Sequence, residues 1–422
     1  MKILYYFHNE CLVSFFKHRL VFFLCIFSFF ASACDHDEKH DLKTFPTEFT
    51  EGNFTLDSLA VDLRIVPLRF REPIAQVRQV KWKDPYFYIS STNGTAVNRI
   101  DIFDLNGNNV GSLEEEGRGP GEYISIYQFA VDDNHYVYVN TLKKIVIYDR
   151  NQNHVRDIPW PEDLRAEMYL FENALYLFDV TYFSSSPPFY DWIVLDTLGN
   201  TLSSKKYQCY KEGPNPQRYD LIVFEGDANL YRYRKICDTI FSIVSKGWNP
   251  ELTINREFDD GYRLHTQEEL ARKVRLDVLA KSLWGTPIRS ISGIWPAGNK
   301  WIVTCEQRYN KRLKFETLIL DRANNRAEKI YQGNFERGKY SPRGIPNDWV
   351  GFGAIQPHKV IQIDSSKYIV SVMGAMDLKN YVNSEEFQKV VPIRPEVKNN
   401  FKIVSGSLAN ESDPVLLLLK LK

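Results

Sequence analysis

The sequence predicts an all-β protein: a six-bladed β-propeller with one inserted amphipathic helix, its ring closed by strands from the two ends of the chain. Three observations predict this fold. A short strand pattern occurs six times within 422 residues, a hairpin pattern follows most of its copies, and the chain ends in a strongly apolar run. Repeats of several short strands, each unit about 45 residues long, are typical of propeller blades.

The first 53 residues are expected to lie outside the propeller. The basic triplet "KHR" precedes the apolar run 20–33, which at 14 residues is too short to cross a bilayer and suits the core of a signal peptide. We therefore expect residues 1–33 to be a removed signal peptide and residues 34–53 to be a flexible tether. The propeller is then expected over residues 54–422.

Cys34 follows the small residues "ASA" directly. This stretch resembles the lipobox of bacterial lipoproteins, in which the cysteine is lipidated and becomes the new N-terminus. The alternative is an ordinary signal peptide that is cut after "ASA", with Cys34 incidental. The acidic cluster "DHDEKH" behind it resembles an export tag for surface lipoproteins. The expected location is therefore the outer membrane, exposed at the cell surface, and the alternative is a periplasm-facing position.

The charge balance argues against nucleic acid as a partner. The chain has 53 basic and 53 acidic residues, and removal of residues 1–33 leaves 50 and 52. Nucleic-acid binding needs a basic footprint, which this balance does not provide. The expected partners are instead the membrane, through the lipid anchor, and a protein or glycan ligand.

Three cysteines remain beyond Cys34, and their odd number implies at least one free thiol. They are Cys209, Cys237 and Cys305. A bridge between Cys209 and Cys237 is conceivable in an oxidising compartment, but the sequence does not establish it.

Six segments share a turn residue followed by alternating bulky and small or polar positions, and each is read as a strand that is entered from a tight turn. They are "DPYFYIS" (84–90), "NHYVYVN" (134–140), "NALYLFD" (173–179), "ANLYRYR" (228–234), "NKWIVTC" (299–305) and "SKYIVSV" (366–372). Six copies imply six blades.

A second pattern of strand, polar turn and strand predicts a hairpin in five of the six units. The equivalent positions are Asp104, Asp149, Asp196, Ser242 and Asp321, at intervals of 45, 47, 46 and 79 residues. Three nearly equal intervals indicate one repeated structural unit. The long fourth interval requires an insertion.

The insertion contains a helical pattern over residues 265–285. Thr266 and Glu269 are spaced as an N-terminal capping box, apolar residues recur every third or fourth position, and Gly285 ends the pattern. We expect an amphipathic helix that packs on the β-protein, in preference to a helix that binds a partner or a membrane.

Both ends of the folded region read as strands. The segment "FTLDSLAVDLRIVPLR" (54–69) opens the region, and "DPVLLLLKLK" (413–422) closes it. Pairing of these strands within one blade would close the ring and leave no open sheet edge at the seam.

The whole pattern resembles a known family. The unit at residues 117–155 resembles an NHL-type propeller repeat, and the chain from Phe54 to Lys422 is similar to six-bladed β-propeller lipoproteins of Gram-negative bacteria. The shared features are the lipobox, "GRGPGEY" after the first blade, "DTIFSI" in the middle and "DPVLLLLKLK" at the end. The resemblance implies the fold, and it carries over no catalytic motif and no cofactor.

The segment "GRGPGEY" (117–123) is the most distinctive loop of the sequence. Its glycines and proline suit a sharp crossing between blades, because glycine tolerates positive φ and proline fixes φ. On this structural reading Arg118 and Glu122 pair with each other or cap backbone groups, while Tyr123 packs between blades. The alternative is that these three side chains contact a ligand.

The search for a catalytic or metal-binding motif finds none. The sequence has no HExxH, CxxC, P-loop or GxSxG motif, so no metal, cofactor or catalytic residue is assigned. Four charged residues within strand-like runs are candidates for facing the polar channel and binding an anionic or sugar-like ligand. The alternative for them is a solvated or mutually paired face. They are Arg232, Arg234, Glu306 and Arg308.

These observations favour a binding or scaffolding lipoprotein of the cell envelope or cell surface, with a protein or glycan partner. The alternative is a glycan- or ester-directed hydrolase or lyase whose carboxylate-based site is spread over several blades, since such a site leaves no sequence motif. A structural subunit of an envelope complex is a third possibility.

Overall fold

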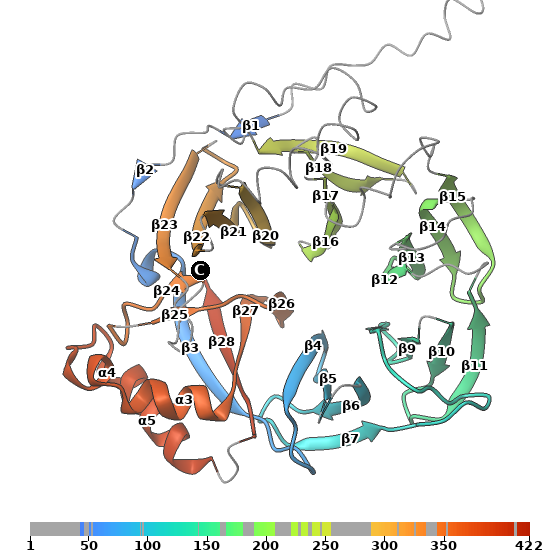
Figure 1. The fold of residues 1–422 in the computed structure, drawn as a ribbon, viewed down its shortest axis with the longest axis horizontal. Coiled ribbons are helices and arrows are strands. Elements are labelled where there is room, and N and C mark those ends of the chain that lie inside the picture. The colour runs from blue at the N-terminus through green and yellow to red at the C-terminus, as the bar shows by residue number, and fades with distance from the viewer. Residues whose placement is uncertain are drawn as a thin grey trace, which may run out of the picture. The chain divides into compact units, whose positions relative to one another are not determined.

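The computed structural model describes residues 43–45, 50–51 and most of 54–422. Its gaps in the last range are 93, 95–96, 142, 161–165, 180–189, 207–220, 227–228, 235–238, 245–246, 255–287, 310–311, 325, 335–343, 352 and 409–411. Six antiparallel sheets follow one another around a common axis, and each runs from an inner to an outer strand (Figure 1). The predicted six-bladed all-β propeller is confirmed.

Five blades are built from four consecutive strands each. The first holds β4 (Gln76–Lys83), β5 (Tyr86–Thr92), β6 (Val97–Phe103) and β7 (Asn109–Leu113), and the second holds β8 (Gln128–Val131), β9 (Val137–Asn140), β10 (Lys144–Tyr148) and β11 (His154–Pro159). The third holds β12 (Ala166–Phe171), β13 (Ala174–Asp179), β14 (Tyr190–Asp196) and β15 (Thr201–Lys206). The fourth holds β16 (Leu221–Gly226), β17 (Asn229–Arg234), β18 (Thr239–Val244) and β19 (Gly247–Ile254), and the fifth holds β20 (Ile288–Ala297), β21 (Lys300–Tyr309), β22 (Arg312–Asp321) and β23 (Arg326–Asn334).

The sixth blade joins the two ends of the propeller, as predicted. Its strands are β26 (Lys359–Ile363), β27 (Ser366–Met373), β28 (Val415–Leu421) and β3 (Ala60–Pro67), in that order. The C-terminal β28 runs antiparallel to β3, with Leu419 opposite Leu63. The apolar run "VLLLL" of β28 is buried completely, because sheet neighbours and adjacent layers cover both of its faces.

Each of the six segments of the first sequence pattern forms the second strand of a blade. These strands are β5, β9, β13, β17, β21 and β27. In β5 and β9 nearly every residue is buried, since each blade packs between two neighbouring blades. A turn followed by closely spaced bulky residues therefore marks the second strand of a blade.

The repeated aspartates begin the turn between the third and fourth strands. The Asp104 carboxylate accepts hydrogen bonds from the Asn106 and Asn108 amides at 2.8 and 2.9 Å, and the Asn108 side chain donates another at 2.8 Å. Asp149 and Asp196 make the same contacts with the residues two and four positions on. The equal spacing thus reflects one repeated turn.

The fourth blade departs from this rule. Ser242, which we aligned with the turn aspartates, lies inside β18 opposite Tyr231 and Asn249. The strand continues two residues beyond it, to Val244. The alignment at Ser242 is therefore wrong, because a serine within the paired part of a strand cannot begin the hairpin turn.

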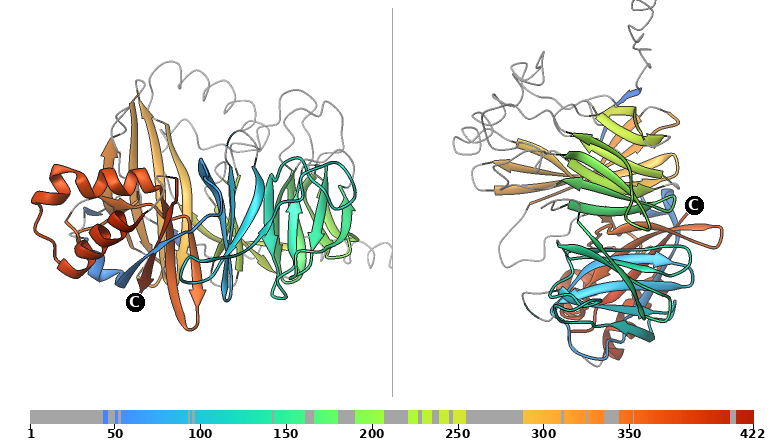
Figure 2. Two further views of the ribbon diagram at one scale, coloured as in Figure 1. Left: turned by 90° about the horizontal axis from the view of Figure 1, so that it is seen from below. Right: turned by 90° about the vertical axis from the view of Figure 1, so that its right-hand side faces the viewer.

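Three helices that the sequence analysis did not predict lie between β27 and β28. They are α3 (Ala375–Asn383), α4 (Glu385–Lys389) and α5 (Pro395–Ser407), and they lie beside β3 on the outer side of the sixth blade (Figures 1 and 2). Leu378, Phe387 and Phe401 share one apolar core with Leu63 and Leu417. The helices thereby cover the face of the closing sheet.

The predicted helix at 265–285 lies outside the described residues, as do Cys34, Cys209 and Cys237. Cys305 is buried and is not part of a disulfide bond. In the described part of the chain no helix is long and apolar enough to cross a membrane.

The remaining short elements precede β3 or flank the helices. The first group is β1 (Lys43–Phe45), β2 (Thr50–Glu51) and the 3-10 helix η1 (Leu56–Ser58), and the second is β24 (Ile345–Pro346) with β25 (Ala354–Ile355). β1 pairs in parallel with the outer strand β19, and β2 pairs in parallel with β23. Strand structure therefore begins within the stretch predicted as a tether.

Candidate functional site

The loop at residues 117–123 connects β7 of the first blade to β8 of the second, as the sequence indicated. The Tyr123 amide donates to the Glu115 carbonyl at 2.9 Å, and the Gly117 amide donates to the Tyr123 carbonyl at 3.0 Å. Gly121 has a φ of 74°, a conformation that glycine adopts without strain. The loop is therefore a closed turn with a defined backbone.

Two side chains of the second blade hold this loop through hydrogen bonds. The Tyr148 hydroxyl donates to the Gly121 carbonyl, and the Lys144 ammonium donates to the Gly119 carbonyl at 3.0 Å. Lys144 also pairs with the Asp157 carboxylate at 2.7 Å. These bonds fix the crossing between the blades at two of its carbonyl groups.

The three predicted loop side chains have different surroundings. Glu122 caps the loop backbone by accepting a hydrogen bond from the Gly119 amide at 2.7 Å. Tyr123 is 2% exposed among apolar residues of both blades, its hydroxyl donates to the Leu113 carbonyl at 3.0 Å, and burial raises its pKa. Arg118 is exposed. The structural roles expected for Glu122 and Tyr123 are thus present.

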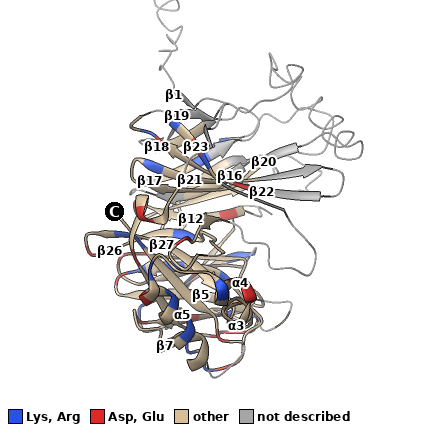
Figure 3. Cartoon of the chain, turned by 90° about the vertical axis from the view of Figure 1, so that its left-hand side faces the viewer, with Lys and Arg blue, Asp and Glu red and all other residues tan. Residues whose placement is uncertain are grey.

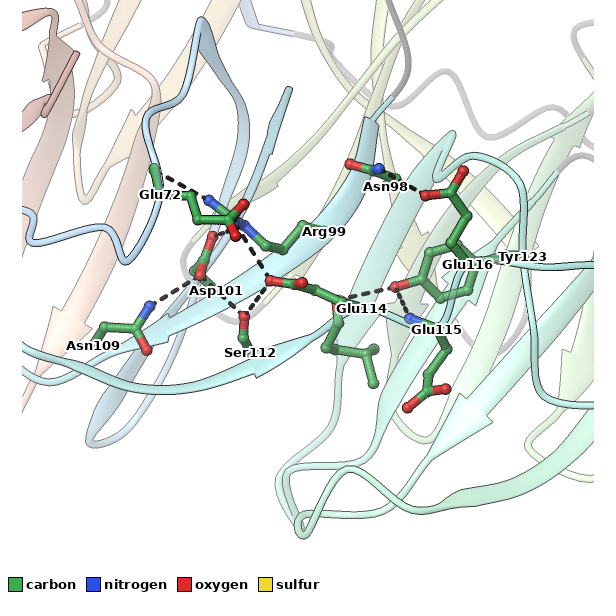
Figure 4. A network of polar contacts seen from close by, with 11 residues as sticks. Glu72, Asn98, Arg99, Asp101, Asn109, Ser112, Glu114, Glu115, Glu116 and Tyr123 are labelled. Carbon is green, nitrogen blue, oxygen red and sulfur yellow. Dashed lines mark hydrogen bonds and ion pairs between the residues drawn. The ribbon is translucent and has the colours of Figure 1, made fainter. Parts of the chain in front are cut away.

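Beside the loop, Arg99 of β6 is the centre of a polar network (Figure 4). Its Nε lies 2.8 Å from Asp101 Oδ2, and its Nη1 lies 3.2 Å from Glu72 Oε2 and 3.4 Å from Glu114 Oε1. Glu72 comes from the connection between β3 and β4, and Glu114 follows β7. One guanidinium group therefore holds carboxylates from three separate segments.

Asp101 is the buried partner of this arginine. Its side chain is fully buried, and it also accepts hydrogen bonds from Asn109 Nδ2 at 2.9 Å and Ser112 Oγ at 3.2 Å. Burial raises its pKa, while the Arg99 charge and these hydrogen bonds oppose that rise. Arg99 is thus held rigidly from the interior, with its far edge turned to the surface.

A cleft of about 120 Å³ opens at this edge of Arg99. The Glu72 and Glu114 side chains at its mouth are 67% and 51% exposed, and the Asn98 amide holds Glu116 at 3.2 Å. Its lining residues are Glu72, Ile74, Ser91, Asn98, Arg99, Glu114 and Glu116. We call this the acidic cleft, because it has three glutamates at its surface around one arginine.

Two exposed apolar side chains lie in the segment that follows the 117–123 loop. Ile124 and Tyr127 are 51% and 39% exposed, although most large apolar side chains of the blades are buried. The Ile126 amide donates to the Val97 carbonyl at 2.6 Å, which brings this segment against the strand that carries Arg99. Elsewhere on the propeller and its helices, acidic and basic residues are interspersed (Figure 3).

Glu72 and Glu114 are not arranged as the carboxylate pair of a glycoside hydrolase. Glycoside hydrolysis needs a sugar and, in inverting enzymes, a water between two carboxyl groups. Glu72 and Glu114 instead contact the same nitrogen of Arg99, so the guanidinium group occupies the space between them. The geometry suits binding of a cationic group at the exposed carboxylate oxygens.

The other predicted residues lie in second strands and not in the innermost strands. Arg232 of β17 is 5% exposed, and its guanidinium carbon lies 5.9 Å from the centre of the Phe178 ring of the third blade. β16 lies between β17 and the axis, so Arg232 lies in the interior of the blades, and ligand binding by this residue stays a prediction. The side chains of Arg234, Glu306 and Arg308 lie outside the described residues, and β17 and β21 carry their backbone.

The sequence analysis missed every residue of the acidic cleft. The available signal was the charge pattern of "RIDIFD", which places Arg99 and Asp101 on one face of a strand that is otherwise apolar. Among the described residues no group of three or more metal-binding side chains is found.

The fold and the cleft define a six-bladed β-propeller with an acidic cleft on its first blade. The chain belongs to the family described as Domain of unknown function (DUF4934), whose model matches residues 48–420. No curated protein matches the sequence.

Solved structures share the fold. A protein of Bacteroides fragilis that is thought to be exported matches with a TM-score of 0.62 and 16% identity, over 90% of this chain and 99% of that one. The extracellular domain of a proposed one-component system of Bacteroides thetaiotaomicron matches with a TM-score of 0.38 and 10% identity, over 73% and 38%. An oligogalacturonate lyase in complex with manganese matches with a TM-score of 0.36 and 9% identity, over 85% and 97%. Only the first of these likenesses is close enough to inform the fold, and none informs the chemistry.

Proposed function

We propose that this chain is an exported binding module of the cell envelope, which holds a protein partner through a lysine or arginine side chain seated in the acidic cleft. The apolar run and "ASAC" at the N-terminus support export and a lipid anchor at Cys34. The likeness to a Bacteroides protein that is thought to be exported supports the same location. The anchored propeller would then face the cell exterior.

One observation carries the choice of partner. Glu72 and Glu114 stand at the mouth of the acidic cleft, and a buried arginine fixes both of them. Fixed carboxylates lose little conformational freedom when they bind a cation, so they favour an ammonium or guanidinium group. With Glu116 included, the charge at the mouth is opposite to that of a basic side chain.

The apolar neighbours favour a protein over a small cation. Ile124 and Tyr127 offer exposed apolar area on the segment that is hydrogen-bonded to Val97, in the strand that carries Arg99. Protein interfaces combine an apolar anchor with a polar rim, and tyrosine is enriched at their strongest contacts. A peptide segment with an apolar residue next to a lysine or arginine fits both features.

The test is binding of synthetic peptides to the purified chain, measured by fluorescence anisotropy. Peptides that carry lysine or arginine beside an apolar residue should bind, and peptides with glutamate in the same position should not. Glu114→Gln together with Glu116→Gln should weaken binding about tenfold, and added salt should weaken it in the wild type.

Glu385→Gln is the matched control, because Glu385 is an exposed glutamate that pairs with Lys389 on helix α4. This variant should bind the basic peptides as the wild type does. Equal binding of basic and acidic peptides, or wild-type affinity in the double variant, would refute the proposed partner.

A further inference from the structure

A second pocket lies between the innermost strands of four consecutive blades. It has a volume of about 210 Å³ and is formed by the ends of β4, β8 and β12, the turns that follow β8 and β12, and Lys359 of β26. We call it the inner-strand pocket. None of the residues that line it also lines the acidic cleft.

Hydrogen bonds between neighbouring blades hold the inner strands in fixed positions. Gln79 of β4 accepts a hydrogen bond from the Phe129 amide of β8 at 3.2 Å, and Gln128 of β8 accepts one from the Met168 amide of β12 at 2.6 Å. The same contact is thus repeated from one blade to the next. The walls of the inner-strand pocket are therefore preorganised, which lowers the entropic cost of binding.

The charges of the inner-strand pocket are balanced. Three lysines (Lys81, Lys83 and Lys359) face three carboxylates (Asp132, Asp133 and Glu172), and Lys83 is paired with Asp133. An anion site would need an excess of lysines, and a cation site an excess of carboxylates. The Asp132 carboxylate already accepts hydrogen bonds from the Asn134 and Tyr136 amides and the Tyr138 hydroxyl, so Asp133 and Glu172 are the acceptors that a ligand can reach. Ammonium donors and carboxylate acceptors without net charge suit hydroxyl groups, which both donate and accept.

Trp82 gives the inner-strand pocket an apolar side. Its indole N–H donates to the Gln362 carbonyl at 2.8 Å and one side of its ring packs against Phe87, so what the ring contributes to the lining is hydrocarbon. Phe171 adds a second aromatic ring to the lining. A sugar has hydroxyl groups and apolar C–H faces. The polar and the apolar residues of the inner-strand pocket match these two kinds of surface.

Glu172 occupies a backbone position that does not favour glutamate. Glu172 and Asn173 form the turn between β12 and β13 with φ values of 48° and 57°. Such turns strongly prefer glycine, asparagine or aspartate at both positions. A glutamate held there against its conformational preference, with its side chain at a pocket, is the kind of strain that accompanies a functional site.

We propose that the inner-strand pocket binds one neutral sugar unit of a glycan. The volume lies below the usual range of about 300–1,000 Å³ for sites of drug-sized ligands, so a single ring or a chain end is the expected occupant. Lysine ammonium groups would donate to the sugar hydroxyls, Glu172 would accept from them, and Trp82 would cover an apolar part of the ring. This site is independent of the proposed peptide site.

The test is a glycan array with the purified chain, followed by calorimetry on the sugars that bind. The array should contain neutral hexose and N-acetylhexosamine oligosaccharides and their uronate-containing counterparts. We expect neutral sugars to bind. Glu172→Gly should weaken binding about tenfold, because it removes a charged acceptor, without lowering the melting temperature, since glycine suits the positive φ.

Asp364→Gly supplies the matched control. Asp364 has a φ of 51° in the turn between β26 and β27, the corresponding turn of the sixth blade, and it does not line the inner-strand pocket. This variant should bind sugar as the wild type does. Absence of neutral-sugar binding, a requirement for a uronate, or full affinity in Glu172→Gly would overturn the proposal. None of these results depends on whether basic peptides bind the acidic cleft.

Discussion

Gly121 and His154 are in contact across the boundary between the first and second blades. A Cβ atom on Gly121 would lie 2.6 Å from Cγ of the His154 ring, and the φ of Gly121 is 74°. Both the backbone conformation and the neighbouring blade therefore exclude a side chain here. The second glycine of "GPG" is therefore required by packing between blades.

We predict that Gly121→Ala lowers the free energy of unfolding by about 1–3 kcal/mol, because alanine is strained at positive φ and its methyl group meets His154. Urea denaturation measures this effect. Gly119→Ala should cost less, since its Cβ would meet only the Glu122 carboxylate, at 3.1 Å. Arg118→Ala should stay within about 0.5 kcal/mol of the wild type. Wild-type stability of Gly121→Ala would show that the loop adapts.

Arg99→Met should destabilise the propeller by about 3 kcal/mol or more, because it leaves Asp101 as an unpaired carboxylate in the interior. Chemical denaturation at neutral pH is the measurement. Replacing both residues, as in Arg99→Met with Asp101→Leu, should restore part of the loss. A single variant as stable as the wild type would mean that water reaches Asp101.

Acid should weaken the fold through the turn aspartates. The pKa of Asp149 is lowered by the Asn153 amide above all, and the pKa of Asp196 is lowered by the Asn200 side chain above all. A carboxyl group with a lowered folded pKa stabilises the protein above its unfolded value of roughly 3.9, and this contribution is lost as pH falls through the folded value. The urea midpoint should therefore drop as pH falls below about 4.

The double variant Asp149→Asn and Asp196→Asn provides the comparison. It should be less stable than the wild type at pH 7, and its urea midpoint should change less on acidification, because two of the titrating groups are gone. Parallel pH profiles for the two proteins would assign the acid sensitivity to other groups.

Deletion of residues 413–422 should abolish cooperative unfolding of the whole propeller. β28 pairs with β27 on one side and β3 on the other, and Val415 to Leu419 are buried. Burial of each such side chain contributes roughly 1.5–3 kcal/mol, so the five together are comparable with a typical total stability of about 5–15 kcal/mol. A truncated chain with a wild-type melting transition in calorimetry would contradict closure by this strand.

Cys34→Ala should release the protein from the membrane, because one diacylated cysteine would be its anchor. Detergent phase partitioning of cell extracts is the measurement. The wild type should enter the detergent phase and the variant the aqueous phase. Retention of the variant in the detergent phase would exclude the lipobox interpretation.

Much of the fold could be predicted because each blade repeats the same local constraints. The crowded second strand and the aspartate turn each leave a short pattern, and Asp104, Asp149 and Asp196 set the spacing. The helices between β27 and β28 were missed because they interrupt the repeat. Local signals for them exist: Ser384 caps α4 through the Phe387 amide, and Pro395 opens α5.

The acidic cleft could not be predicted in the same way. Glu72, Arg99 and Glu114 belong to three different segments of the chain. Only the folding of the first blade and of the connection that leads into it brings them together. No fixed spacing identifies such a set. The place of Arg232 within its blade could not be predicted for a related reason: alternation along a strand gives the two faces, but it does not tell which strand of a blade is innermost.

The pairing of β1 with β19 and of β2 with β23 has a mechanical consequence. If the chain is tethered at Cys34, a pull on the tether reaches the three residue pairs of β1 first and the two residue pairs of β2 next. Both contacts lie on outer strands, so they can peel away one pair at a time. Only then is the load passed to β3, whose seven residue pairs with β28 must shear together. Under tension, the pairing of the N-terminal strands β1 and β2 would thus break before the β3–β28 pairing that closes the ring.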